Sequence, residues 1–258
     1  MSEGSVNFDR AAEYYDRTRV TDPEALAETL DVIEGEIAGR STVLEIGVGT
    51  GALAVPLTER GHDVVGMDLS TAMLGQLRQK SAGLPVAAGD ATRLPFADDA
   101  FAGAYARWVL HLIPAWRDAV AELARVVGSG GVVLIEPGGY RGTWLEIWRR
   151  LRDELGDVAH PIGLDTNERG FADLDEAFEA HGATPRELPA VTAATTSTLG
   201  RFFAEGHERL FSWTWRVDPD RLHPALDAVE AWARQRYGDD LDGVTNEVEM
   251  AWRAYEMP

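Results

Sequence analysis

The sequence contains no cysteine and no long apolar run. The missing cysteines exclude disulfide bonds, thiolate metal sites and cysteine nucleophiles. No segment reaches the roughly 18 uninterrupted apolar residues of a membrane span, and the N-terminus, MSEGSVNFDR, lacks the basic and apolar parts of a signal peptide. We therefore expect a cytoplasmic protein that does not enter a membrane.

Basic residues are also scarce. The 258 residues include 24 Lys and Arg against 43 Asp and Glu, which gives a formal net charge of −19. Nucleic-acid binding requires a local basic surface, and the densest basic segment, residues 149–152, is flanked by acids at helical spacing. This composition argues against DNA and RNA as partners and favours a small-molecule substrate.

Glycines gather in one short segment, VLEIGVGTG, which runs from Val43 to Gly51. Its apolar residues predict a buried β-strand, and Gly47, Gly49 and Gly51 predict a turn whose backbone can pass close to a ligand. A helical pattern follows from Ala52 to Arg60. A strand, a glycine turn and a helix in this order predict the start of a Rossmann-like unit that binds a cofactor.

Strands and helices continue to alternate after this unit, which predicts an α/β fold with a parallel sheet and helices on both faces. The strands are predicted at 42–46, 63–67, 85–88, 101–107 and 131–136, and the helices between them at 52–60, 71–80 and 114–127. Later helices are predicted at 143–155 and 171–180, and two last strands at 186–192 and 247–255.

These patterns divide the chain into four parts. We predict an N-terminal helical lid (1–40), a Rossmann-like cofactor-binding core (41–192), a helical insertion that caps the substrate (193–243) and the last strand of the core sheet (244–258). The insertion is rich in aromatic residues, and most of them are expected to form core, with the lining of an apolar substrate pocket as the alternative. They are Phe202, Phe203, Phe211, Trp213, Trp215 and Trp232.

The glycine turn alone is compatible with two cofactors. Gly47, Gly49 and Ala52, with Asp68 lying 21 residues after Gly47, match a relaxed dinucleotide fingerprint. A dinucleotide would place its pyrophosphate beside the carboxylate of Glu45, which is unfavourable. S-adenosylmethionine carries an ammonium, a sulfonium and one carboxylate but no phosphate, so the acidic lining favours it over a nicotinamide dinucleotide.

Carboxylates are expected at the ends of the first three strands. Glu45 belongs to the first strand, Asp68 follows the second and Asp90 the third. Because ligands of open α/β sheets bind at the carboxyl ends of the strands, all three are expected around the cofactor. Asp90 is placed to accept a hydrogen bond from the adenine amine, and the Ala91 amide to donate one to a ring nitrogen.

Four motifs resemble, in order, those of the class I S-adenosylmethionine-dependent methyltransferases, in the group similar to the ubiquinone and menaquinone biosynthesis methyltransferases. They are VLEIGVGTG (43–51), VVGMDLS (64–70), GDATRLPFADDAFAGAYARWVLHLI (89–113) and LARVVGSGGVVLIEPG (123–138). The resemblance covers residues 8–137 and implies a Rossmann-like sheet of seven strands, mostly parallel, whose last strand is antiparallel.

The resemblance also implies roles for individual residues. The three glycines of the turn would contact the methionine part of the cofactor, and Asp68 would accept both ribose hydroxyls. Further contacts are implied for Leu69 and Met73 with the adenine, for the carbonyl near Arg107 with the ammonium group, and for Tyr15 and Arg19 with the carboxylate.

Residues on the acceptor side carry weaker signals. His111 would lie near the sulfonium, where it is a candidate general base, and the alternative is that it holds its loop through a backbone hydrogen bond. Trp108, Trp144 and Trp148 are candidate walls for a flat or apolar acceptor, and Trp148 is equally compatible with helix core. No histidines and carboxylates have metal-ligand spacing, so no metal is expected.

The sequence thus predicts an enzyme that transfers methyl from S-adenosylmethionine to a small-molecule acceptor by positioning and in-line displacement. One alternative is a regulatory protein that binds this cofactor without transferring the methyl group. A less favoured alternative is a nicotinamide-dependent oxidoreductase.

Overall fold

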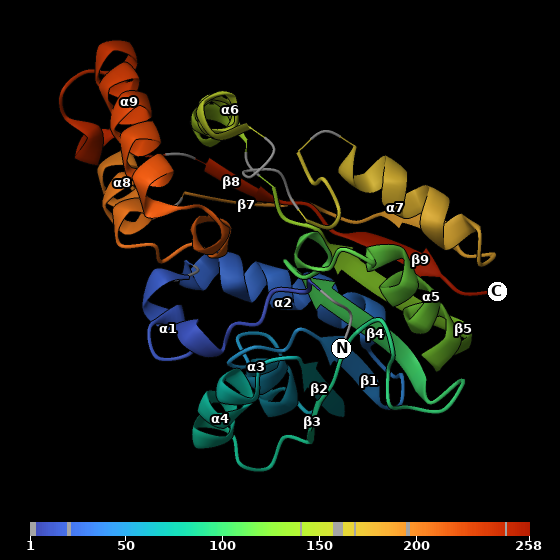
Figure 1. The fold of residues 1–258 in the computed structure, drawn as a ribbon. Coiled ribbons are helices and arrows are strands. Elements are labelled where there is room, and N and C mark those ends of the chain that lie inside the picture. The colour runs from blue at the N-terminus through green and yellow to red at the C-terminus, as the bar shows by residue number, and fades with distance from the viewer. Residues whose placement is uncertain are drawn as a thin grey trace.

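A seven-stranded sheet forms the centre of the protein in the computed structural model (Figure 1). The structure describes residues 4–19, 22–139, 141–156, 162–167, 169–194, 197–245 and 247–258. The strands of this sheet are β1 (Val43–Ile46), β2 (Val64–Asp68), β3 (Val86–Ala88), β4 (Phe101–Arg107), β5 (Val127–Glu136), β6 (Thr184–Glu187) and β9 (Arg253–Glu256).

The strand order is β3-β2-β1-β4-β5-β9-β6. Strands β1 to β5 pair in parallel, whereas β9 is antiparallel to both β5 and β6. The expected Rossmann-like sheet of seven mostly parallel strands is therefore confirmed. The chain leaves β1 toward β2 and later returns to pair β4 with β1, and this change of direction creates the crevice in which ligands of such sheets bind.

Helices cover both faces of the sheet because the strands alternate apolar side chains between them. In β5, Val132 and Leu134 join the core under one face, and Val133 and Ile135 join the core under the other. The first face is covered by α2 (Pro23–Ile37), α3 (Ala54–Glu59) and α4 (Thr71–Lys80), and the second by α5 (Trp116–Val126) and α7 (Gly170–Glu179).

The two last predicted strands were wrong in their extent. Each is divided, because β7 (Val191–Ala194) and β8 (Glu247–Met250) pair with each other in a separate two-stranded sheet. Pro189 lies between β6 and β7, and because proline has no backbone N–H it interrupts the ladder there. The chain therefore passes from one sheet to the other within residues predicted as one strand.

A helical cluster stands beyond the carboxyl end of the sheet, with its own apolar core. It consists of α6 (Gly142–Leu155), α8 (Leu199–His207), the 3-10 helix η4 (Ser212–Arg216), α9 (Pro219–Tyr237) and the 3-10 helix η5 (Leu241–Gly243). Figure 1 shows β7 and β8 running from the main sheet toward α8 and α9. Within the described residues, no helix has the length and apolarity needed to span a bilayer.

Candidate active site

One cavity of about 420 Å³ lies at the carboxyl ends of the parallel strands. It extends from the glycine turn after β1 to the helical cluster, and the N-terminal segment also contributes to its walls. Most predicted site residues line it: Tyr15, Arg19, Gly47, Gly49, Asp68, Leu69, Met73, Asp90, Ala91, Arg107, Trp108, His111, Trp144 and Trp148. Glu45 and Gly51 are the predicted residues that do not line it.

The glycine turn brings bare backbone to the cavity. Gly47 has a φ of 67°, and a Cβ at this position would lie 2.2 Å from Cγ2 of Val109. Glycine is therefore required there both by conformation and by space. Gly51, with a φ of 87°, also requires glycine, and its added Cβ would lie 2.7 Å from Cγ2 of Val55 in α3.

Asp68 ties the end of β2 to the glycine turn. Its Oδ2 accepts a hydrogen bond from the Gly49 N–H at 2.8 Å, and its Oδ1 accepts one from the Ser70 N–H at 2.8 Å. Ser70, rather than Asp68, caps α4, since its Oγ accepts from the Met73 N–H. Burial raises the pKa of Asp68. A carboxylate offers about four lone-pair sites, so the group can still accept hydrogen bonds from a ligand.

Asp90 stands at the end of β3, on the same edge of the sheet as Asp68. Its Oδ1 accepts hydrogen bonds from the backbone N–H of Thr92 at 3.0 Å and from the Thr92 hydroxyl at 2.8 Å. These bonds fix the carboxylate in the cavity wall beside Ala91.

Glu45 does not line the cavity, and its side chain is buried. Val43 packs under the face covered by α2 and α3, whereas Leu44 and Ile46 pack under the other face. The two-residue period of the strand therefore turns Glu45 to the α2 and α3 side. Burial raises its pKa to about 8, so the carboxyl is mostly protonated at neutral pH. The charge argument that excluded a pyrophosphate through Glu45 consequently loses its basis.

The N-terminal segment is fastened over the glycine turn by acidic side chains. Asp9, in the 3-10 helix η1 (Asp9–Ala11), accepts hydrogen bonds from the Ser70 hydroxyl at 2.6 Å and the Ala72 N–H at 3.1 Å. Asp16, in α1 (Tyr15–Thr18), accepts one from the Thr50 hydroxyl at 2.6 Å. These bonds bring the segment that carries Tyr15 and Arg19 to the cavity.

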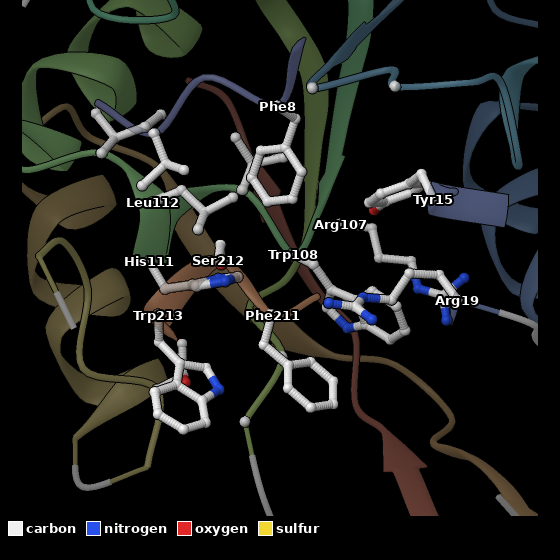
Figure 2. Close-up of a pocket in the computed structure, with 18 of the residues that line it drawn as sticks. Phe8, Tyr15, Arg19, Arg107, Trp108, His111, Leu112, Phe211, Ser212 and Trp213 are labelled. Atoms are coloured by element: carbon white, nitrogen blue, oxygen red, sulfur yellow. The ribbon is translucent and has the colours of Figure 1, made fainter. Parts of the chain in front are cut away.

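Arg19 lies between two aromatic rings at this edge. Its guanidinium carbon is 5.9 Å from the ring centre of Tyr15 and 5.2 Å from that of Phe211. Figure 2 shows Arg19, Tyr15 and Arg107 on one side of the cavity and His111, Leu112 and Trp213 on the other.

Arg107 and Glu136 form a buried pair at the ends of β4 and β5, where they are register partners. Their side chains are only 8% and 4% exposed, yet Arg107 Nε and Glu136 Oε2 are 3.8 Å apart, beyond hydrogen-bond distance. Burial raises the pKa of Glu136 to about 7. Its Oε1 accepts a hydrogen bond from the Gly138 N–H at 3.1 Å, so it also caps the loop after β5.

Trp108 adopts a backbone conformation that is rare for a bulky residue. Its φ is 57°, in the left-handed region, and the ring lies under the Arg107 guanidinium at 4.1 Å (Figure 2). A Cβ at Gly138 would lie 2.9 Å from Cδ1 of Trp108, so the facing loop leaves room for this ring only with glycine. Such strain is concentrated at functional sites.

Aromatic residues from distant segments form the end of the cavity near the helical cluster. Of the six aromatic residues in the predicted insertion, Phe202, Phe211 and Trp213 line the cavity, Phe203 belongs to the cluster core, and Trp232 packs against that core. Trp148 lines the cavity and packs on Trp213 with ring centres 5.3 Å apart. Phe202 and Trp213 also belong to the cluster core, so core packing and cavity lining occur together in these side chains.

Phe8 adds an aromatic ring from the N-terminal segment, and no sequence motif pointed to it. It packs on Trp215, with ring centres 5.1 Å apart. Val109 and Arg141 also line the cavity without a preceding signal. The signals for such a wall in the sequence were the excess of aromatic residues after residue 195 and the candidate wall residues Trp108, Trp144 and Trp148.

His111 lies in the 3-10 helix η2 (Leu110–Leu112) and lines the cavity. Burial lowers its pKa to about 4, although a hydrogen bond with the Pro137 backbone opposes this shift. The imidazole is therefore neutral at physiological pH.

A Rossmann-like sheet with a ligand cavity at its switch point defines a cofactor-binding α/β protein. Residues 44–135 match the methyltransferase domain family. The chain is 33% identical over 185 residues to a demethylmenaquinone methyltransferase of Streptomyces avermitilis, covering 69% of this chain and 79% of that one. It is 31% identical over 196 residues to a malonyl-[acyl-carrier protein] O-methyltransferase of Halorhodospira halophila, covering 70% of this chain and 66% of that one.

The chain therefore belongs to the class I S-adenosylmethionine-dependent methyltransferases, and it spans about two thirds or more of the length of these two relatives. It is a methyltransferase that uses S-adenosylmethionine. The solved structure of the YcgJ protein from Bacillus subtilis has the same fold, with a TM-score of 0.60, 19% identity and coverage of 92% of this chain and 100% of that one. The [4+2]-cyclase SpnF is also similar in fold, with a TM-score of 0.51, 21% identity and coverage of 93% and 83%.

Proposed function

We propose that the protein methylates a small-molecule acceptor with a flat or apolar body. The observation that carries this proposal is the division of one cavity into two chemically different ends. Asp68, Asp90 and the glycine turn lie at one end, and Trp144, Phe211 and other aromatic residues lie at the other. The first end suits a polar nucleoside, and the second suits an apolar molecule.

At the cofactor end, the residues present fit S-adenosylmethionine. Asp68 would accept the ribose hydroxyls with its remaining lone pairs, and Asp90 with the Ala91 amide would contact the adenine edge, against Leu69 and Met73. Gly47 and Gly49 would offer backbone groups to the methionine part, near the end of β4 at Arg107. Tyr15 and Arg19 would hold the carboxylate. In this scheme Glu45 and Gly51 stabilise the glycine turn without contacting the cofactor.

S-adenosylmethionine supplies an electrophilic methyl group when it is bound. The chain would contribute orientation of the acceptor and exclusion of water. We assign these tasks to residues 1–40 as a lid and to residues 193–243 as a cap, because Phe8 and Phe211 reach the same cavity from these two segments. The proposal includes a cytoplasmic location and no nucleic-acid partner, as the net charge of −19 favours.

The sequence relatives support a small acceptor. One is a demethylmenaquinone methyltransferase and another a malonyl-[acyl-carrier protein] O-methyltransferase, so the reacting part named for each is a small organic group. His111 remains a candidate general base, and its neutral imidazole is able to accept a proton.

Calorimetry and a turnover screen together test this function. S-adenosylhomocysteine should bind with a micromolar dissociation constant, whereas NADH should not raise the melting temperature. A screen of phenols, amines and polyketide-like acceptors should then reveal consumption of S-adenosylmethionine. Lack of binding to the intact protein would contradict the cofactor assignment. Binding without turnover of any acceptor would favour the regulatory alternative.

A further inference from the structure

Arg107 is a buried cation that forms no hydrogen bond to an oxygen atom among the described residues. Its Nη2 donates to the sulfur of Met250 at 3.0 Å, and its Nε has no hydrogen-bond partner of normal geometry there. Glu136 stays 3.8 Å away. A guanidinium offers five N–H donors, so a strongly buried one with a thioether as its hydrogen-bond partner is poorly satisfied.

A second arginine, Arg253, shows how a largely buried guanidinium is paired with carboxylates in this protein. The Arg253 side chain is 15% exposed, and its guanidinium forms hydrogen bonds with the carboxylates of Asp175 and Glu187. Arg107 is more buried, at 8%, and has neither bond. Since buried charges require paired partners, the cavity next to Arg107 is the place from which an oxyanion would come.

Four arginines line the cavity, Arg19, Arg107, Arg141 and Arg216, and the cofactor alone does not account for both Arg19 and Arg107. S-adenosylmethionine has one carboxylate, and the proposed function assigns it to Arg19. Arg19 has no carboxylate partner among the described residues, and its side chain donates to the carbonyl of Thr18 at 3.0 Å. Arg107 is then left for the other substrate. It is also stacked on Trp108, which extends the aromatic wall of the acceptor end.

We propose that Arg107 binds an oxyanion, a carboxylate or a phenolate, of an acidic acceptor whose apolar body lies against the aromatic wall, and that Glu136 is its positioning residue. This inference rests on the proposed function and narrows its acceptor class. Trp108 fixes the plane of the guanidinium, so a planar oxyanion can be bound through two parallel N–H groups. The ammonium group of a lysine cannot donate two parallel hydrogen bonds in this geometry.

Glu136 lies close enough to Arg107 to position it electrostatically, but it leaves the N–H donors of Arg107 available to a ligand. One carboxyl oxygen is occupied by the Gly138 N–H, and the other faces Nε at 3.8 Å. The charged groups that act on this carboxyl are Arg107 from β4 and Arg141 before α6. Burial raises the pKa of Glu136 to about 7, which weakens its competition with a ligand oxyanion near neutral pH.

Matched anionic and neutral probes test this inference. The protein is first saturated with S-adenosylhomocysteine, and binding is measured by calorimetry for 3-phenylpropionate against 3-phenylpropionamide, and for 4-nitrophenolate against nitrobenzene. We expect at least one anion to bind about tenfold more tightly than its neutral partner. The two pairs distinguish a carboxylate from a phenolate. Equal binding within both pairs, or no binding of either anion, would overturn the inference.

Variants then assign the preference to Arg107. Arg107→Gln should abolish the tenfold difference, and Arg107→Lys should retain part of it. Arg117→Gln is the matched control, because Arg117 is exposed and its guanidinium carbon also lies 4.2 Å from the centre of a tryptophan ring, that of Trp116. It should leave the preference unchanged. A preference that persists in Arg107→Gln would contradict the assignment.

The role of Glu136 has its own readout. Because its carboxylate competes for Arg107, the affinity for the ionised form of the preferred anion, corrected for the anion's own protonation, should increase as the pH falls from 8 to 6, and Glu136→Gln should remove this dependence. A purely structural role would leave the pH profile of the variant unchanged. Failure of S-adenosylhomocysteine to bind would instead contradict the proposed function, so the two failures are distinguishable.

Discussion

The two ends of the cavity are built in different ways. At the cofactor end, Gly47, Asp68 and Asp90 each stand at or just after the end of a parallel strand, within about fifty residues of chain. At the acceptor end, Phe8 and Phe211 come from segments about 200 residues apart, and Trp144 comes from a helix beyond the core strands. The first end depends on sheet topology alone, and the second depends on how distant segments pack.

This difference explains how proteins that share this fold can catalyse different reactions. The [4+2]-cyclase SpnF shares the fold at 21% identity, so the architecture by itself does not specify methyl transfer. The cofactor end, which is built on the strand ends of the sheet, can remain the same between relatives while the aromatic residues of the acceptor end differ. Variants at each end should therefore affect one ligand and spare the other.

The largest effect is expected at the cofactor end. Asp68→Ala removes the acceptor for the ribose and the hydrogen bond to the Gly49 N–H, so S-adenosylhomocysteine should bind about 100-fold more weakly in calorimetry. Asp98→Ala is the control, because the Asp98 side chain is 75% exposed and pairs with Arg125 outside the cavity. An affinity within threefold of wild type for Asp68→Ala would contradict the assigned role.

A smaller effect, confined to the acceptor, is expected at the other end. Phe211→Ala should raise the acceptor KM about tenfold, because one aromatic wall is lost, and should change the cofactor affinity less than threefold. Trp232→Leu offers a comparison, since Trp232 packs against the same helical cluster but does not line the cavity. Equal effects of both variants on KM would show that the cluster acts only through its stability.

His111→Ala should have a still smaller effect, lowering kcat less than tenfold. Burial leaves the imidazole with a pKa of about 4, so it is a weak base at neutral pH. Steady-state rates with the best acceptor of the screen provide the measurement. A loss of about 100-fold or more, with unchanged cofactor binding, would instead support the general-base hypothesis derived from the sequence.

The smallest functional effect is expected for Glu45→Gln, which should leave cofactor binding within threefold and change stability instead. The pKa of Glu45 is about 8 in the folded protein against an ordinary value of 4.5, so its contribution to stability is present at low pH and lost between these values. The stability of the variant relative to wild type should therefore increase from pH 5 to pH 8, by up to about 1.4 kcal/mol per pH unit. Urea denaturation at both pH values measures this, and a difference that does not change with pH would contradict a buried, protonated Glu45.

The local sequence pattern predicted the central strands accurately. It failed where the outcome depends on the burial of a single side chain or on which strands pair with each other. Residues 101–107 were predicted as a strand and form β4 with the same bounds. Glu45 was predicted at the cofactor because it lies in the right motif, but it is buried and does not line the cavity. The residues predicted as two last strands form four, because pairing partners rather than propensity determine where a strand changes sheets.

The sequence by itself determined the class of fold and the position of the cofactor end. Strand periodicity, a glycine turn and acids after successive strands act over a few residues, and parallel strands bring their carboxyl ends to one edge regardless of what surrounds them. Only the tertiary structure decided which aromatic residues line the cavity, and that Arg107 is buried with no carboxylate of the described residues in hydrogen-bond contact. These properties depend on burial and on contacts between segments far apart in the chain, which no local pattern encodes.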